Sequence, residues 1–321
     1  MDTENILPDD MPPDEYLSED ILPDGLPKIL PPYENGIFRS ILTLPEAHAA
    51  LVSIVAAILD RPVKTVTLRN NEAPSRDKLA KREQYDINCV VDGEDGNQFA
   101  CEMQASPMAG DNRENNHRNI KWRSVYNLSH LHSNQPGKGI DYGDYVRSYQ
   151  IMLCNYKAFD FENELLERFM FRNEKGTELC GAVTAIFVDL TKAKEIAKKP
   201  VGEMSDVEDW VVFLALGNNP KYSGIIDGII KRKEGVAVAR ETLFSISQNP
   251  DERARFHSRR KWLQDREHER AVALKEGREE ARKEYEPQLA SKDAELASKD
   301  AELASMAAEI AALRAKLNEG Q

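Results

Sequence analysis

Acidic and amide side chains recur on alternate residues in two neighbouring apolar runs of the chain. Asp86 lies in the first run, and Glu102 and Gln104 lie in the second. Between the runs, residues 92–96 read Asp-Gly-Glu-Asp-Gly, and both residue types favour chain reversal because they tolerate positive φ angles. We therefore expect a hairpin that places Asp86 roughly opposite Glu102 and Gln104.

Alternation along these runs sorts their side chains onto two faces, because successive residues of a strand point to opposite sides. One face is apolar and is expected to lie against a hydrophobic core, and the other carries oxygen and amide groups. The apolar face holds Ile87, Cys89, Val91, Phe99, Cys101 and Met103, and the polar face holds Asp86, Asn88, Glu102 and Gln104.

Two carboxylates a few ångströms apart repel each other unless a cation lies between them. Mg²⁺ is the expected cation, because it takes one or two carboxylates, keeps several waters and can hold a phosphate while activating a water for in-line attack. An ordinary solvent-exposed hairpin face also commonly carries Asp, Asn, Glu and Gln. Spacing alone leaves both interpretations open.

Four sequence segments together carry a family resemblance. Residues 85–87 (Tyr-Asp-Ile) are followed by residues 99–104 (Phe-Ala-Cys-Glu-Met-Gln), then by 123–126 (Arg-Ser-Val-Tyr) and 139–145 (Gly-Ile-Asp-Tyr-Gly-Asp-Tyr). This series resembles the PD-(D/E)XK nuclease superfamily, in the form found in the recombination-promoting nuclease (Rpn) and putative transposase group. That group typically carries Glu-x-Gln where other members carry Glu-x-Lys.

The resemblance also extends upstream of the hairpin. Residues 34–39 (Glu-Asn-Gly-Ile-Phe-Arg) are similar to the group's acidic-acidic-x-x-Phe-Lys opening, from which Asn35 and Arg39 depart. In all, the resemblance covers roughly residues 30–285.

The resemblance implies a role for each polar residue of the hairpin. Asp86 and Glu102 would be ligands of Mg²⁺, for which Mn²⁺ can substitute, and the backbone carbonyl of Met103 would complete the shell. Gln104 would orient the attacking water. An amide supplies no full positive charge, so we expect slower cleavage than with a lysine, or reliance on a second metal or on Arg123. Glu46 is a candidate further ligand, although the helix dipole alone also favours a carboxylate there.

Basic and aromatic residues gather on a predicted helix over 112–132, directly after the hairpin. Their composition fits contacts to DNA phosphates, which draw mainly on Arg and Lys. A solvated helix face would explain the same residues. The candidate DNA contacts are Arg113, Arg118, Lys121, Arg123 and Tyr126.

Helices and strands alternate around the hairpin. A helix is expected over 46–59, with Pro45 suited to its first turn and residues 60–62 (Asp-Arg-Pro) as its stop. Further strands are expected over 63–68, 148–154 and 182–188. By the resemblance, this order gives an α/β fold with a restriction-endonuclease-like core, in which a mixed central sheet is flanked by helices. C-terminal helices and a short coiled coil follow.

The first 35 residues differ in composition from the rest. They hold ten acids, one base and seven of the sixteen prolines, which predicts disorder. They also carry nine of the twelve net negative charges, so the acidic balance does not argue against a nucleic-acid partner. No charged-then-apolar leader and no run of eighteen apolar residues occurs. We therefore expect a cytoplasmic protein without a membrane partner.

A seven-residue repeat, Ser-Lys-Asp-Ala-Glu-Leu-Ala, begins at Ser291 and again at Ser298. Two positions of each heptad would form the seam, the apolar contact between the helices of a coiled coil. The second seam position holds Lys in the first heptads and apolar residues only later, which predicts a weak or short coiled coil. We predict a homo-oligomer formed through residues 288–318, with a solitary charged helix as the alternative. Pro287 is expected to start or kink this helix. The first seam position holds Leu289, Leu296, Leu303, Ile310 and Leu317.

Four regions are expected: an acidic, Pro-rich disordered arm (1–32), a nuclease-like core (33–190), a helical C-terminal region (191–286) and a heptad-repeat tail (287–321). The leading function is a Mg²⁺-dependent DNA endonuclease that promotes recombination or transposition. A catalytically weak or inactive DNA-binding or scaffold protein is the first alternative, and a nuclease acting on RNA is the second. Phosphate-loop, GxGxxG and GxSxG motifs are absent from the sequence, so nucleotide hydrolysis and serine acyl transfer have no support.

Overall fold

The computed structural model describes residues 21–23, 25–69, 87–93, 98–106, 113–135, 141, 144–159, 161 and 164–319. Within these ranges, the side chains of residues 35, 98–106, 113–119, 263, 267 and 315–319 are not described. The chain divides after Ser258 into a compact unit and a second unit, Arg259–Gln321.

A six-stranded mixed sheet, in the order β1-β2-β3-β4-β6-β5, lies at the centre of the compact unit. The first three strands pair antiparallel, β4 runs parallel to both β3 and β6, and β5 is an antiparallel edge strand. The parallel step from β3 to β4 needs a crossover, which helix α3 (Arg113–Ser133) supplies. The strands are β1 (Val63–Leu68), β2 (Ile87–Gly93), β3 (Gln98–Ser106), β4 (Arg147–Cys154), β5 (Leu166–Met170) and β6 (Val183–Asp189).

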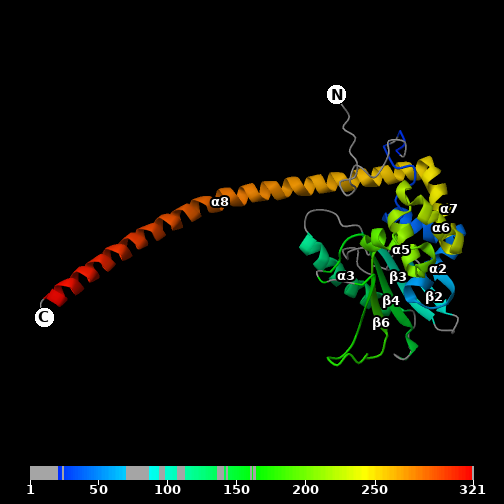
Figure 1. Ribbon diagram of the computed structural model, residues 1–321, viewed down its shortest axis with the longest axis horizontal. Coiled ribbons are helices and arrows are strands. Elements are labelled where there is room, and N and C mark those ends of the chain that lie inside the picture. Colours follow the sequence, from blue (N-terminus) through cyan, green and yellow to red (C-terminus); the bar gives the residue numbers. More distant parts are fainter. Residues whose placement is uncertain are drawn as a thin grey trace. The chain divides into compact units, whose positions relative to one another are not determined.

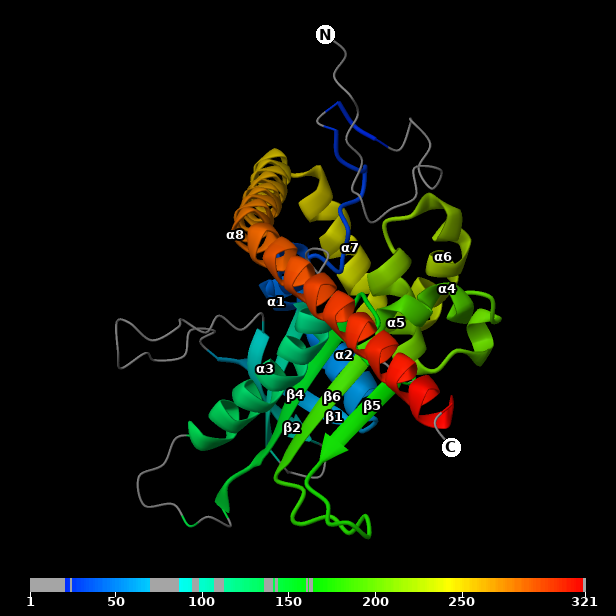
Figure 2. The same cartoon turned by 90° about the vertical axis from the view of Figure 1, so that its left-hand side faces the viewer.

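Helices cover both faces of this sheet, so alternate residues of β4 enter two different cores. Ile151 and Leu153 pack with the helices of the larger core. Met152 and Cys154 pack with Ile120 of α3 on the other face, where Figure 2 shows α3 lying along the sheet. The larger core is formed with α1 (Asn35–Thr43), α2 (His48–Leu59), α4 (Ala193–Ile196), α5 (Asp206–Leu216), α6 (Ser223–Arg232) and α7 (Glu234–Gln248). These layers confirm the expected α/β fold with a mixed sheet between helices.

Local sequence explains both ends of α2. Residues Pro45–Ala47 form a 3₁₀ turn, so the α-helix begins at His48, two residues later than expected. It ends at Asp60, whose φ of 53° lies in the left-handed region. Asp tolerates this conformation better than most residues, and Pro62 cannot continue a helix.

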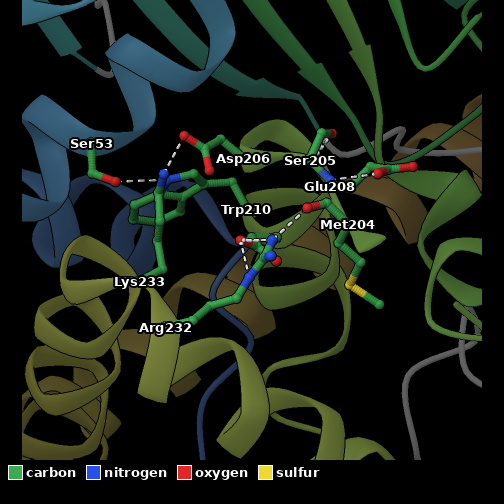
Figure 3. A network of polar contacts seen from close by, with 9 residues as sticks. Ser53, Met204, Ser205, Asp206, Glu208, Trp210, Arg232 and Lys233 are labelled. Atoms are coloured by element: carbon green, nitrogen blue, oxygen red, sulfur yellow. Dashed lines mark hydrogen bonds and ion pairs between the residues drawn. The ribbon is translucent and has the colours of Figure 1, made fainter. Parts of the chain in front are cut away.

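The indole of Trp210, on α5, connects that helix to α2 by a hydrogen bond. The ring is buried, and its Nε1 donates a hydrogen bond to Ser53 Oγ at 3.2 Å (Figure 3). Helix α5 itself begins with a capping box, in which Ser205 and Glu208 exchange side-chain and backbone hydrogen bonds. The helical region after β6 therefore shares one core with the helices before β1.

A glycine allows α7 to approach α2 closely. A Cβ added to Gly235 would overlap the Ser53 side chain and lie 3.2 Å from the carbonyl oxygen of Ala49. We expect Gly235→Ala to lower the free energy of unfolding by about 2 kcal/mol, because the helices must separate and the Ser53–Trp210 hydrogen bond must shift. Urea unfolding followed by circular dichroism measures this loss.

The matched control for that substitution is Gly224→Ala, on α6. A Cβ at Gly224 would meet no atom within 4 Å, so its stability should stay within about 1 kcal/mol of the parent. Equal stability of the two variants would contradict the close approach of α2 and α7.

Part of the N-terminal segment packs on the compact unit. Leu26 and Leu30 are buried, and the Leu30 backbone N–H donates to Ser247 Oγ at 3.0 Å. The Arg253 guanidinium donates to the Pro27 carbonyl at 3.0 Å. The predicted disorder therefore does not extend to residues 25–32, because leucines between the prolines bury apolar surface that the average composition conceals. Residues 1–20 lie outside the described ranges.

Helix α8 (Pro250–Glu319) spans 70 residues and runs through Pro287 without ending (Figure 1). The expectation that a separate helix starts at this proline is wrong. Proline removes one backbone hydrogen bond at a cost of about 3 kcal/mol, but Ala, Glu, Lys and Leu on both sides favour the helix. The coiled coil expected in this unit stays a prediction.

Within the described ranges, no single helix is both long enough and apolar enough to cross a membrane. The bent pair Gly36–Thr43 and Pro45–Leu59, with 74° between its halves, meets the length and composition criteria only when taken together.

Candidate functional site

Strands β2 and β3 form the expected hairpin. Ile87 pairs with Met103, and Asn88 pairs with Glu102. The side chains of Ile87, Cys89 and Val91 are fully buried, which confirms the apolar face predicted for this strand. Asp86 lies outside the described residues, and Glu102, Met103 and Gln104 are placed here by their strand positions only.

Glu102 occupies an interior position of the sheet with a polar residue in register on each side. Asn88 of β2 is its antiparallel partner, and Gln150 of β4 is its parallel partner. The next polar position of β3, Gln104, pairs with Met152. A third strand, β4, therefore adds a polar residue, Gln150, to those of the hairpin. The α3 crossover separates this strand from the hairpin in the sequence.

Gln150 was missed by reasoning from sequence alone. Its side chain is fully buried, and its Nε2 lies 3.3 Å from Met152 Sδ. Its Oε1 has no hydrogen-bond partner within the described part of the chain. Leaving such a group unpaired costs about 1–3 kcal/mol, so an amide oxygen beside Glu102 that has no partner among the described residues marks this position for function. A Gln directly before the apolar run Ile151–Cys154 was the available signal.

A second unpaired polar atom lies on the same side of the sheet. Ser124 of α3 is 1% exposed, and its Oγ has no partner among the described residues. Gln150 and Met152 are two residues apart on β4, so both face α3, and Met152 belongs to the core cluster that includes α3. Two polar atoms that have no partner among the described residues therefore lie in the layer between α3 and β4.

The C-terminal end of α3 is fastened to the start of β4 by a small polar cluster. His132 Nδ1 and Gln135 Nε2 each lie 3.0 Å from Ser148 Oγ, and Ser148 is fully buried. Gln135 also accepts a hydrogen bond from the Val146 backbone N–H at 2.9 Å. Burial lowers the pKa of His132 below its ordinary value, so its ring stays neutral at pH 7. This cluster fixes α3 against the strand that carries Gln150.

His130 and His132 of α3 contact different aromatic rings. The ring of His130 stacks on Tyr126, while the ring of His132 lies against Tyr145. Among the described side chains, no group of three or more His, Cys, Asp or Glu residues could hold a metal ion. Oxygen donors from Asp86 and Glu102 would suit Mg²⁺ or Mn²⁺ chemically. The Gln150 amide oxygen, which has no partner in the described part of the chain and belongs to a residue in register with Glu102, fits a site that accepts a further polar group.

Glu46, the candidate further ligand, is exposed in the 3₁₀ turn that precedes α2. Helix α2 packs on the face of the sheet opposite α3. Its role as a ligand stays a prediction.

The candidate DNA-contact residues of α3 have different surroundings. Arg123 and Tyr126 are exposed. Lys121 is half-buried, with its Nζ 5.0 Å from the centre of the Phe159 ring, a cation–π contact. The side chains of Arg113 and Arg118 are not described. Contact of these five residues with DNA stays a prediction.

The mixed sheet, the β2–β3 hairpin and the α3 crossover together define a restriction-endonuclease-like fold. The chain belongs to the PD-(D/E)XK nuclease family transposases, because the model of that family matches residues 32–273, most of its length. Nucleases of this class typically use divalent metals, and the family implies DNA as the partner. No curated protein and no solved structure gave a significant match.

Proposed function

We propose that this protein is a metal-dependent DNA endonuclease that promotes recombination or transposition. The observation that carries the proposal is the position of Glu102 on an interior strand, in register with Asn88 and with Gln150, whose buried amide oxygen has no partner among the described residues. A buried polar group such as the Gln150 amide oxygen, in a sheet covered by helices on both faces, is costly unless it serves a site.

In this proposal, Asp86 and Glu102 would hold Mg²⁺, for which Mn²⁺ can substitute, and the Met103 carbonyl would complete the protein's share of the ligands. A bound divalent ion supplies Lewis acidity and lowers the pKa of a coordinated water. Gln104 accepts a hydrogen bond from the attacking water and orients it toward phosphorus. Hydrolysis joins the water oxygen to phosphorus, breaks one P–O bond and releases the sugar oxygen as a hydroxyl group.

Binding of the substrate backbone is assigned to α3. Arg113, Arg118, Lys121, Arg123 and Tyr126 are the proposed contacts, and the absence of Asp and Glu from residues 115–133 favours approach of a polyanion. The polar cluster around Ser148 would hold the helix in a fixed place relative to the hydrolytic strands, which favours productive placement of a phosphate.

The tail is proposed to join copies of the chain through residues 288–318. Exposed apolar side chains at the two heptad positions of α8 support this association. An isolated helix gains little from such a stripe until a partner buries it. The exposed members are Leu289, Leu296, Leu303, Met306, Ile310 and Leu313. The division of the chain into four regions stays a proposal, with residues 25–32 packed on the compact unit and with α8 continuous across residue 287.

Cleavage that depends on a divalent ion tests the proposed function. With Mg²⁺, the intact chain should convert supercoiled plasmid to nicked or linear DNA, and Mn²⁺ should replace Mg²⁺. Excess EDTA should stop the reaction, because the water then lacks its activating ion. Agarose-gel time courses measure the rate.

Two results would contradict this proposal. Cleavage that continues in EDTA would show that the ion is not needed. Plasmid binding without cleavage in either metal would favour the DNA-binding scaffold instead. A labelled RNA of matched length, run beside the plasmid, decides whether the substrate is DNA or RNA, and preferential RNA cleavage would overturn the assignment to DNA.

A further inference from the structure

Helix α3 carries an aromatic strip on its outward face. Trp122 is 67% exposed and Tyr126 is 58% exposed, and these residues are four apart, so their side chains lie on the same side of the helix. The His130 ring continues the strip, because it stacks on Tyr126 with 6.2 Å between ring centres and 15° between planes.

The opposite face of α3 holds the residues that pack on the sheet. Ile120, Ser124, Asn127, Leu128 and Leu131 are all buried. The exposed rings of Trp122 and Tyr126 therefore take no part in the core. Single exposed apolar side chains are common on proteins, but two large rings one helical turn apart, the second stacked on a third, form a row of rings suited to a flat partner.

The charges around the aromatic strip of α3 indicate which class of partner it binds. Residues 115–133 contain no Asp or Glu, while Lys121 and Arg123 flank Trp122 in the sequence. An anionic partner that presents flat rings is an unpaired nucleic-acid strand, since bases offer their faces for stacking and phosphates offer charge. In a duplex the base faces are already stacked on each other, so they are closed to protein rings.

We propose that α3 binds a single-stranded DNA segment, with bases stacking on Trp122 and Tyr126 and phosphates contacting Lys121 and Arg123. The inference rests on the proposed nuclease function and specifies its substrate as DNA with an unpaired strand next to the site of cleavage. Residues four apart are about 6 Å apart along the helix axis, so each ring takes a separate base.

Binding to oligo(dT) in EDTA tests the inference without any cleavage. The intact chain should carry Trp262→Phe, which leaves Trp122 as the main exposed tryptophan because Trp210 is 1% exposed. Oligo(dT) should quench the Trp122 emission, and the anisotropy of a labelled oligo(dT) gives the affinity. A duplex of the same length serves as the reference.

Trp122→Ala and Tyr126→Ala should each lower the ratio of single-strand to duplex affinity about tenfold, which matches the loss of one stacked base. Trp122→Phe keeps a ring at this position and should retain most of the single-strand binding. The matched control is Phe244→Ala, because Phe244 is 51% exposed on α7, which packs on the other face of the sheet. Its affinity ratio should not change.

An unchanged ratio in both alanine variants would overturn the inference, and so would absence of quenching. Loss of a self-associated species in Trp122→Ala with intact oligo(dT) binding, seen by sedimentation velocity, would assign the strip to a protein interface and overturn it as well. Plasmid cleavage separates the two proposals. Cleavage without single-strand binding overturns this inference alone, and single-strand binding without cleavage overturns the nuclease function alone.

Discussion

Replacing Glu102 by Gln should reduce Mg²⁺-dependent plasmid cleavage about a thousandfold. The amide has nearly the same shape as the carboxylate, so the strand can keep its pairing with Asn88 and Gln150. It lacks the negative charge that a divalent ion requires from its ligands. Loss of metal activation costs several kcal/mol in the barrier, and each 1.4 kcal/mol is worth about a factor of ten in rate. Asp86→Asn should show a similar loss.

Nicking rates measured over a Mg²⁺ titration distinguish weaker binding of the ion from slower chemistry. Asp92→Asn is the matched control, because Asp92 lies on β2, the partner strand of the same hairpin, and pairs with Gln98 instead of Glu102. Its rate should stay within about twofold of the parent, as for a residue that makes no contact with the reacting groups. If Glu102→Gln cleaves at the parental rate, Glu102 is not a metal ligand and the proposed site is wrong.

Removal of the Arg232 side chain should lower the free energy of unfolding by about 3–5 kcal/mol at pH 7. The guanidinium donates to Asp209 Oδ2 from Nη2 at 2.6 Å and from Nε at 3.1 Å. It also donates to the Met204 carbonyl (Figure 3). Asp209 is fully buried. Arg232→Ala would leave this carboxylate without its compensating charge, and urea unfolding measures the loss.

The loss of stability caused by Arg232→Ala should become smaller as the pH falls. Burial raises the pKa of the Asp209 carboxyl, while the hydrogen bonds and charge of Arg232 oppose that rise. Without Arg232 the pKa of Asp209 should rise further, so the folded variant takes up a proton at a higher pH than its unfolded chain. The free energy of unfolding of Arg232→Ala, relative to that of the parent, is therefore lowest at pH values above this raised pKa. It recovers as the pH falls through the raised pKa.

Urea unfolding at pH 7 and at several lower values tests this dependence. Arg255→Ala is the matched control, because Arg255 pairs with Glu252 at 2.7 Å but its side chain is 76% exposed. An exposed pair of this kind contributes at most about 1 kcal/mol, and its removal should cause little change at any of these pH values. A stability difference for Arg232→Ala that stays constant with pH would contradict the role given to Asp209.

Local sequence determined the elements that carry the proposed hydrolytic residues. Gly and Asp between two alternating runs predict the β2–β3 hairpin, and the alternation predicts the buried face of Ile87, Cys89 and Val91, as found. Pro45 and Pro62 bound the helical segment between them for equally local reasons. The edge strand β5 was missed because its residues, Leu-Glu-Arg-Phe-Met, do not alternate strictly between apolar and polar.

Only the tertiary structure decided which distant residues meet. The neighbour of Glu102 on β4 depends on the register of a parallel pair, and a crossover helix separates those strands in the sequence. Arg232 and Asp209, and likewise Leu30 and Ser247, meet through packing of whole helices and segments. Turns and alternation act over a few residues, whereas register and burial are set by the closest packing of the entire core. The sequence by itself therefore specified the hairpin and indicated the family of the chain. The packing of the core placed Gln150 beside Glu102.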